Sequence, residues 1–282
     1  MSTSASDQTT PWLEVLRDSV PLGRVRYALF DFDGTLSTIR RGWEQVMAPL
    51  MVESICGDGP PDPTIAAEVA DFIQQSTGTL TIRQMMWLAD TVRRYGRNAT
   101  VLSAGEYKRI YNQRLLAAIQ HRLNSLDNGG AYADHSRLMI AGARDFLTAL
   151  ARRGVALYFA SGTDQEYVCK EAAALGLAGF FGAEIHGAAG DSLDESKERV
   201  IARILADRGL AGPELLVVGD GPVEIGFARQ AGAVALGIAA DEERGCGLDE
   251  RKRRRLVAAG ANLLVTDFLN AEALADLLAG TG

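Results

Sequence analysis

The feature that most constrains this chain is a short apolar run that ends directly in two acidic residues. Residues 25–30 have the composition of a buried β-strand, and Asp31 and Asp33 follow with a single residue between them. Alternate side chains of an extended chain point to the same side, so both carboxylates can face one site where the strand ends. Gly34 then allows the backbone to turn sharply. Two carboxylates at one point predict a bound cation.

A second apolar run, residues 155–160, stops at Ser161, Gly162 and Thr163. A hydroxyl and backbone N–H groups at a turn into a helix suit a phosphoryl oxygen. Lys197 follows further along, at the start of a helical pattern, and is one of only four lysines in the chain. Its ammonium can neutralise a carboxylate and phosphoryl oxygens together.

A third apolar run, residues 215–218, leads into Gly-Asp-Gly-Pro-Val-Glu, which places Asp220 and Glu224 four residues apart. Carboxylate oxygens are the ligands that a hard cation such as Mg²⁺ prefers. Each segment alone has an ordinary explanation as a turn or a helix start. Their order, and the strand-length runs before three of them, favour one shared site at the edge of a parallel sheet.

These segments together resemble the four motifs of the haloacid-dehalogenase-like (HAD) superfamily. Residues 31–35, Asp-Phe-Asp-Gly-Thr, match the first motif; Ser161 matches the second and Lys197 the third, while Asp220 and Glu224 match the fourth. The carbon–halide hydrolases of the superfamily lack the second Asp of the first motif, and the phosphoryl-transfer members keep it. The chain therefore resembles the phosphatase branch, and the resemblance covers its whole core.

The resemblance implies a role for each matched residue. Asp31 would attack phosphorus and Asp33 would act as general acid and base, assisted by Ser161 and Lys197. The implied cofactor is Mg²⁺, held by Asp31, the backbone carbonyl of Asp33, Asp220 and Glu224. Many members carry Asp at the position of Glu224. Because the Glu side chain is longer, Glu224 could bind the metal either directly or through a water molecule.

The predicted fold is α/β, with a Rossmann-like parallel sheet core and an inserted α-helical domain. Apolar residues recur at helical spacing in four segments between the first and second motifs: 43–55, 64–75, 81–95 and 105–123. In the superfamily an insertion here is a cap that closes over the active site. We therefore expect an N-terminal extension at 1–24, a core at 25–37 and 136–282, and a helical cap at 38–135.

Several residues near the first motif and in the insertion are candidates for substrate contact: Thr35, Arg40, Arg41, Trp43, Thr81, Arg83 and Gln84, with Gly162 from the core. Paired arginines in a linker are also typical of a solvated surface. Residues 1–10 are predicted to be disordered, and Pro11–Ser19 to form a short amphipathic helix with Trp12, Leu13 and Leu16 as apolar contacts.

Charge and composition exclude several classes of protein. A net charge of −7 argues against a general nucleic-acid binder, and no run of residues is long enough to span a membrane. Three separated cysteines predict no disulfide framework and a reduced, cytoplasmic location. The basic run 251–255 is predicted to be a solvated helix face. The histidines lack the spacing of metal ligands, which argues against a zinc enzyme. Ser161 lacks a nucleophile-elbow context, which argues against a serine hydrolase.

The predicted function is a Mg²⁺-dependent phosphatase that hydrolyses a small-molecule phosphate monoester, such as a sugar phosphate, through an aspartyl-phosphate. A sugar phosphomutase would use the same residues, although Thr35 favours hydrolysis weakly. A phosphonate hydrolase would need a cap lysine, and Lys108 is the only one. A non-catalytic phosphate-binding module is the alternative from another class. The oligomeric state and the identity of the substrate are left open.

Overall fold

The computed structural model describes residues 12–17, 21–127, 135–193 and 196–280. Its centre is a seven-stranded sheet with the strand order β1-β7-β6-β5-β2-β3-β4. Neighbouring strands from β7 to β4 are parallel, and β1 joins β7 antiparallel at the edge. The strands are β1 (Leu13–Val15), β2 (Tyr27–Phe30), β3 (Ala156–Asp164), β4 (Ile185–Ala188), β5 (Leu215–Gly219), β6 (Val234–Ile238) and β7 (Leu263–Val265).

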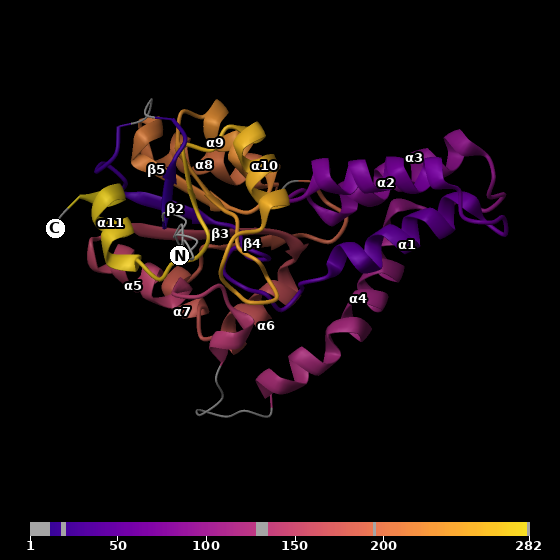
Figure 1. The fold of residues 1–282 in the computed structure, drawn as a ribbon, viewed down its shortest axis with the longest axis horizontal. Coiled ribbons are helices and arrows are strands. Elements are labelled where there is room, and N and C mark those ends of the chain that lie inside the picture. Colours follow the sequence, from indigo (N-terminus) through magenta and orange to yellow (C-terminus); the bar gives the residue numbers. More distant parts are fainter. Residues whose placement is uncertain (1–11, 18–20, 128–134, 194–195, 281–282) are drawn as a thin grey trace, which may run out of the picture.

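Helices cover both faces of this sheet (Figure 1). Strand residues alternate between two buried clusters: Ala28 and Phe30 belong to one, and Leu29 between them belongs to the other. A strand buried on both faces needs apolar residues throughout, which explains why the core strands read as continuous apolar runs. The core helices are α5 (Ala143–Arg152), α6 (Gln165–Ala174), α7 (Ala178–Phe181), α8 (Lys197–Arg208), α9 (Pro222–Gln230), α10 (Glu250–Ala259) and α11 (Ala271–Ala279).

Four helices lie between β2 and β3 in the chain, and we call them the helical insertion: α1 (Trp43–Cys56), α2 (Pro63–Ser76), α3 (Thr81–Tyr95) and α4 (Ala104–Asp127). They project from the core on the side away from α11, and α4 runs back toward the core (Figure 1). Helix α1 contacts α2, α3 and α4, so the insertion has an apolar interior of its own. The four predicted helical segments are confirmed, whereas the domain boundaries stay a prediction.

The predicted amphipathic helix near the N-terminus is wrong within the described residues. Leu13–Val15 form strand β1, with Leu13 opposite Val265 and Val15 opposite Leu263. The exposed edge of β7 offers unpaired backbone groups, and pairing with them outweighs a weak helical pattern in so short a segment. Trp12 remains 42% exposed, although Leu13 and Leu16 do pack against the core.

Other predicted elements are confirmed with small shifts of their ends. Strand β3 continues to Asp164, so the Ser161–Thr163 segment lies in extended backbone before α6. All three cysteines are free. Among the described helices, none has the length and hydropathy needed to cross a bilayer. Residues 1–11, which include the whole of the expected disordered segment 1–10, lie outside the described residues.

Candidate active site

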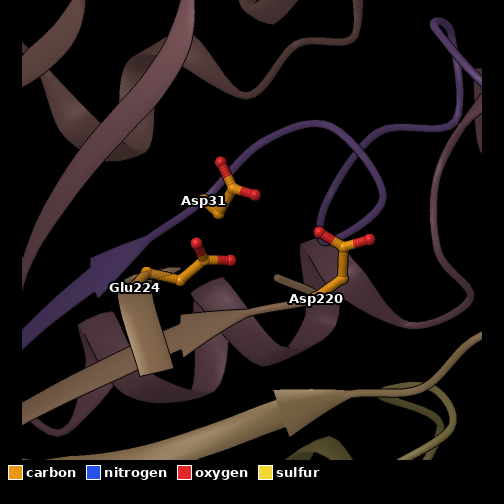
Figure 2. A group of neighbouring side chains, drawn as sticks. All are labelled: Asp31, Asp220 and Glu224. Carbon is orange, nitrogen blue, oxygen red and sulfur yellow. The ribbon is translucent and has the colours of Figure 1, made fainter. Parts of the chain in front are cut away.

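Three buried carboxylates meet where the neighbouring strands β2 and β5 end (Figure 2). Asp31 directly follows β2, and its backbone N–H donates to the Val218 carbonyl at 2.9 Å, which holds it beside the end of β5. Asp220 follows β5, and Glu224 lies in the first turn of α9. One carboxylate oxygen from each of the three residues lies within 4.8 Å of the others.

This donor set fits Mg²⁺. Carboxylate oxygens suit a small hard cation, and the cluster offers one from each of three residues. The pKa of Asp31 is raised well above its usual value, because burial and the neighbouring Glu224 and Asp220 charges outweigh the attraction of Lys197. Because burial contributes most to this shift, the ionised form of Asp31 is disfavoured, and a divalent cation bound beside it would favour that form.

Lys197 supplies a fixed positive charge to two of the three acids. Its Nζ lies 2.7 Å from Asp31 Oδ1 and 3.2 Å from Glu224 Oε2, and its side chain is 4% exposed. Burial alone would lower the pKa of Lys197, but the two carboxylates raise it, so the ammonium stays charged. The position is set locally, since the Ser196 hydroxyl caps α8 by accepting from the Arg199 N–H and the helix starts at Lys197.

Asp33 lies beside the cluster and receives hydroxyl donors from β3. The Thr163 hydroxyl donates to Asp33 Oδ2 at 3.1 Å, and the Ser161 hydroxyl lies 3.5 Å from the same oxygen. Its Oδ1 has no hydrogen-bond partner and lies 3.9 Å from Arg40 Nε. Burial raises the pKa of Asp33 to about 6, in spite of the nearby Arg40 charge. Such a carboxyl can both give and take a proton near neutral pH.

The basic run 251–255 is not simply a solvated helix face, which corrects the sequence-based expectation. Lys252 is buried, with Nζ 2.8 Å from Asp220 Oδ2 and 2.7 Å from Glu242 Oε1. Arg255 Nη2 lies 3.2 Å from the same Asp220 oxygen. Burial would raise the pKa of Asp220, but these two cations hold it below its usual value. Asp249 caps α10 and so sets which residues of the run face the site.

A cavity opens above these acids, and the helical insertion forms much of its wall. The loop between α2 and α3, residues 77–80, lies against the motif loops of the core. Gly221 is required there, because a Cβ at this position would lie 2.7 Å from the Thr77 carbonyl oxygen. Gly162 is required for the same reason opposite the Thr79 carbonyl. The close approach of two backbones explains these glycines.

The structure brings most of the predicted site residues to this cavity. Its lining includes Asp31, Asp33, Ser161, Gly162, Lys197 and Asp220 from the core, and Arg40, Trp43, Thr81 and Gln84 from the linker and the insertion. Glu224 lies directly beneath it, in contact with Lys197. The functional roles assigned to these residues stay predictions.

Three candidates for substrate contact lie away from the lining. Thr35 is fully buried, and Arg41 donates to Glu243 Oε2 at 3.0 Å. Arg83 is exposed and is not among the residues that line the cavity. Neither arginine therefore reaches the cavity from its position in this structure.

Sequence reasoning missed several residues at the site: Thr77, Thr79, Tyr111, Asn112, Leu115, Glu171, Glu242, Lys252 and Arg255. The scarcity of lysine offered a signal for Lys252, because it was the argument that singled out Lys197. No sequence pattern marked Tyr111 or Asn112, since they lie inside the long helix α4 among other residues with helical spacing.

Comparisons with known proteins agree with the fold. A family model described as haloacid dehalogenase-like hydrolase matches residues 25–232. No curated protein matches the chain. The fold is a parallel α/β sheet with acids at its strand ends, and the family model covers well over half of the chain. The chain belongs to the haloacid dehalogenase-like hydrolase family.

Solved structures with the same fold share little sequence with this chain. A predicted phosphatase from Clostridium acetobutylicum has 17% identity and a TM-score of 0.55, covering 89% of this chain and 97% of that one. A predicted phosphoglycolate phosphatase from Haemophilus somnus gives the same four values. A candidate beta-phosphoglucomutase from Bacteroides vulgatus has 17% identity and a TM-score of 0.54, covering 90% and 91%. At this identity the likeness establishes the fold.

Proposed function

We propose that this protein is a Mg²⁺-dependent phosphatase that hydrolyses a small-molecule phosphate monoester through an aspartyl-phosphate. The observation that carries this proposal is the placement of Asp31, in contact with Lys197 and beside Asp220 and Glu224, at the floor of a cavity. The family of hydrolases and the phosphatases among the structural neighbours support it. The cavity wall formed by the insertion favours a small ester over a phosphoprotein surface.

In the first step, an Asp31 carboxylate oxygen attacks phosphorus, and the bond from phosphorus to the ester oxygen breaks. Asp33 gives its proton to the departing alkoxide, so the alcohol leaves neutral. A pKa of about 6 for Asp33 leaves a useful protonated fraction for this task near neutral pH. The Thr163 and Ser161 hydroxyls hold Asp33 Oδ2 in position.

In the second step, water attacks phosphorus in the aspartyl-phosphate and the bond to Asp31 breaks. Asp33, now ionised, takes a proton from this water, which restores both carboxyl groups and releases inorganic phosphate. The fixed Lys197 charge stabilises the phosphoryl oxygens through both steps. Mg²⁺, held by Asp31, Asp220 and Glu224 with the Asp33 carbonyl, would offset the charge of the phosphoryl group when bound.

The proposal is tested by phosphate release from a panel of small phosphate esters, with Mg²⁺ and with excess chelator. We expect release by the native protein with Mg²⁺, and a loss of at least about 10³-fold in the chelated protein and in Asp31→Asn. Asp90→Asn is the matched control, because Asp90 lies on α3 with its side chain 77% exposed.

The alternatives give different results in the same experiment. Isomerised sugar phosphate without net phosphate release, in the presence of a sugar bisphosphate activator, would identify a phosphomutase instead. Binding of esters without turnover by the native protein would identify a phosphate-ligand-binding module. Equal release by the native protein and Asp31→Asn would contradict the proposed mechanism.

A further inference from the structure

Arg40 is the one cation of the cavity lining, within the described residues, that lies outside the acid cluster. It belongs to the linker between β2 and α1, and its side chain is 6% exposed. The other lining cation, Lys197, is committed to Asp31 and Glu224. The net charge around Arg40 therefore determines whether the cavity attracts a second anionic group of the substrate, beyond the phosphoryl group.

The charge of Arg40 is already compensated from behind the cavity wall. Glu171 on α6 accepts from Arg40 Nε at 3.1 Å and from Nη2 at 2.7 Å, and its side chain is 4% exposed. Because this bidentate ion pair balances the charge of Arg40, its remaining guanidinium N–H groups are suited to donate hydrogen bonds to uncharged groups of a ligand. Asp33 Oδ1 adds a second carboxylate 3.9 Å from Nε. Tyr167 lies against the guanidinium, with its ring centroid 5.5 Å from Cζ.

Among the described residues, the other side chains that the insertion contributes to the wall carry no charge. Its residues offer hydroxyl, amide and phenol groups beside apolar surface: Trp43, Thr77, Gly78, Thr79, Thr81, Gln84, Tyr111, Asn112 and Leu115. A carboxylate or second phosphate placed here would lose its hydration and meet no net positive charge. Hydroxyl groups would find donors and acceptors.

We propose that the leaving group of the substrate is an uncharged polyol or sugar, and that Glu171 determines this selectivity by neutralising Arg40. This inference rests on the proposed phosphatase function and narrows its substrate class. Glu171 is a positioning residue, since it does not line the cavity and acts through Arg40. It disfavours substrates with an anionic leaving group, such as phosphoglycolate or a sugar bisphosphate.

The test uses pairs of esters that differ in one group, a terminal CH₂OH or the corresponding carboxylate. Glycerol 3-phosphate and 3-phosphoglycerate form the shortest pair, followed by erythritol 4-phosphate with 4-phosphoerythronate and glucitol 6-phosphate with 6-phosphogluconate. For the native protein we expect kcat/KM to favour the neutral member of the best pair at least 10-fold. Glu171→Gln should reduce that ratio at least 10-fold, through a lower KM for the anionic member.

Two further variants separate selectivity from damage to the fold. Arg40→Met with Glu171→Met removes both charges, and it should keep the preference for the neutral ester even where kcat falls. Glu166→Gln lies on the same helix with its side chain 68% exposed, and it should leave the ratio unchanged. A purely structural role for Glu171 would lower kcat for both esters and leave their ratio as in the native protein, which would overturn the inference.

Binding distinguishes failure of this inference from failure of the proposed function. Isothermal titration of the same pairs into Asp31→Asn measures selectivity without turnover. Native protein that releases no phosphate, while Asp31→Asn still binds the neutral esters more tightly, overturns the phosphatase and supports the selectivity. Equal or tighter binding of the carboxylates, or no binding of any neutral ester, overturns the inference.

Discussion

At the scale of single residues, the acids of the site differ in how their charges are compensated. Asp31 contacts Lys197 directly, and Asp220 contacts both Lys252 and Arg255. Asp33 has no such partner, because the nearest cation, Arg40, lies 3.9 Å away and is shared with Glu171. Burial raises the pKa of Asp33 to about 6 because Arg40 opposes it only in part, whereas Lys252 and Arg255 outweigh burial at Asp220 and lower its pKa. The two residues are suited to different tasks, proton transfer and cation binding.

The raised pKa of Asp33 predicts a stability penalty with a defined pH range. Between its ordinary value of 3.8 and about 6, the folded protein holds a proton at Asp33 that the unfolded chain has lost. The free energy of unfolding therefore falls as pH rises through this range. Asp33→Asn removes the penalty, so it should be more stable than the native protein by about 2 kcal/mol at pH 7 and equally stable near pH 3.5.

This prediction is checked by urea denaturation at both pH values. The predicted gain is set below the full value of the shift, because the Asp33 side chain is 23% exposed. Asp90→Asn on α3 again serves as the exposed control. If the native protein is as stable as Asp33→Asn at pH 7, the ionised Asp33 carries no free-energy penalty in the folded protein, and the prediction is wrong.

At the scale of elements, the loop between α2 and α3 connects the helical insertion to the acid cluster. Gly78 in this loop has a φ of +90°, and a Cβ there would collide with Glu224 Oε2 and lie 3.4 Å from Lys197 Nζ. In the sequence, only the helix-breaking segment 76–78 between two helical patterns marks this loop. In the folded protein this loop forms part of the wall of the candidate site.

Gly78→Ala should therefore lower kcat/KM by about 100-fold, because its methyl group pushes the loop away from Glu224 and misplaces the cavity wall. Gly96→Ala is the matched control: its φ of +61° gives similar backbone strain, but the nearest atom lies 4.0 Å from the added Cβ. This control should lose about 1 kcal/mol of stability and keep its kcat/KM. Steady-state kinetics and thermal unfolding of both variants provide the measurement, and equal kinetic losses would contradict the assigned contact.

At the scale of the whole molecule, the helical insertion is fastened to the core on two sides of the cavity. On one side, Lys108 of α4 forms a buried ion pair with Asp164, and Asn112 Nδ2 donates to Asp164 Oδ2 at 3.0 Å. On the other side, Arg255 of α10 lies 3.8 Å from Glu44 and 3.4 Å from Gln74 of the insertion. These contacts help to hold the insertion over the cavity.

Lys108→Met should loosen the first of these attachments and leave Asp164 without its cation. We expect kcat/KM to fall about 10-fold, because the free energy of closing the insertion over the core should become less favourable by about 1.4 kcal/mol. Lys170→Met is the control, because Lys170 is 71% exposed and forms an ion pair with Glu166 on its own helix. Small-angle scattering should show a larger radius of gyration for Lys108→Met, and unchanged values in both measurements would contradict this role.

The sequence by itself determined the elements of the core and the chemistry at their ends. Apolar runs of strand length, each followed by an acid or a hydroxyl, predicted the parallel strands β2, β3 and β5 that carry the candidate site. Helical spacing predicted the four helices of the insertion, since buried helices need apolar residues every three to four positions. These properties depend on local backbone preferences and on burial, which a linear pattern records directly.

Only the tertiary structure decided which charges meet. Lys252 and Asp220 lie 32 positions apart, and Arg40 and Glu171 are separated by 131, so no local pattern marks either contact. The N-terminal strand β1 was likewise missed, because its partner β7 lies at the other end of the chain. Long-range electrostatic pairs and edge strands are fixed by how elements pack together, and packing brings together residues whose separation in the sequence carries no periodic signal.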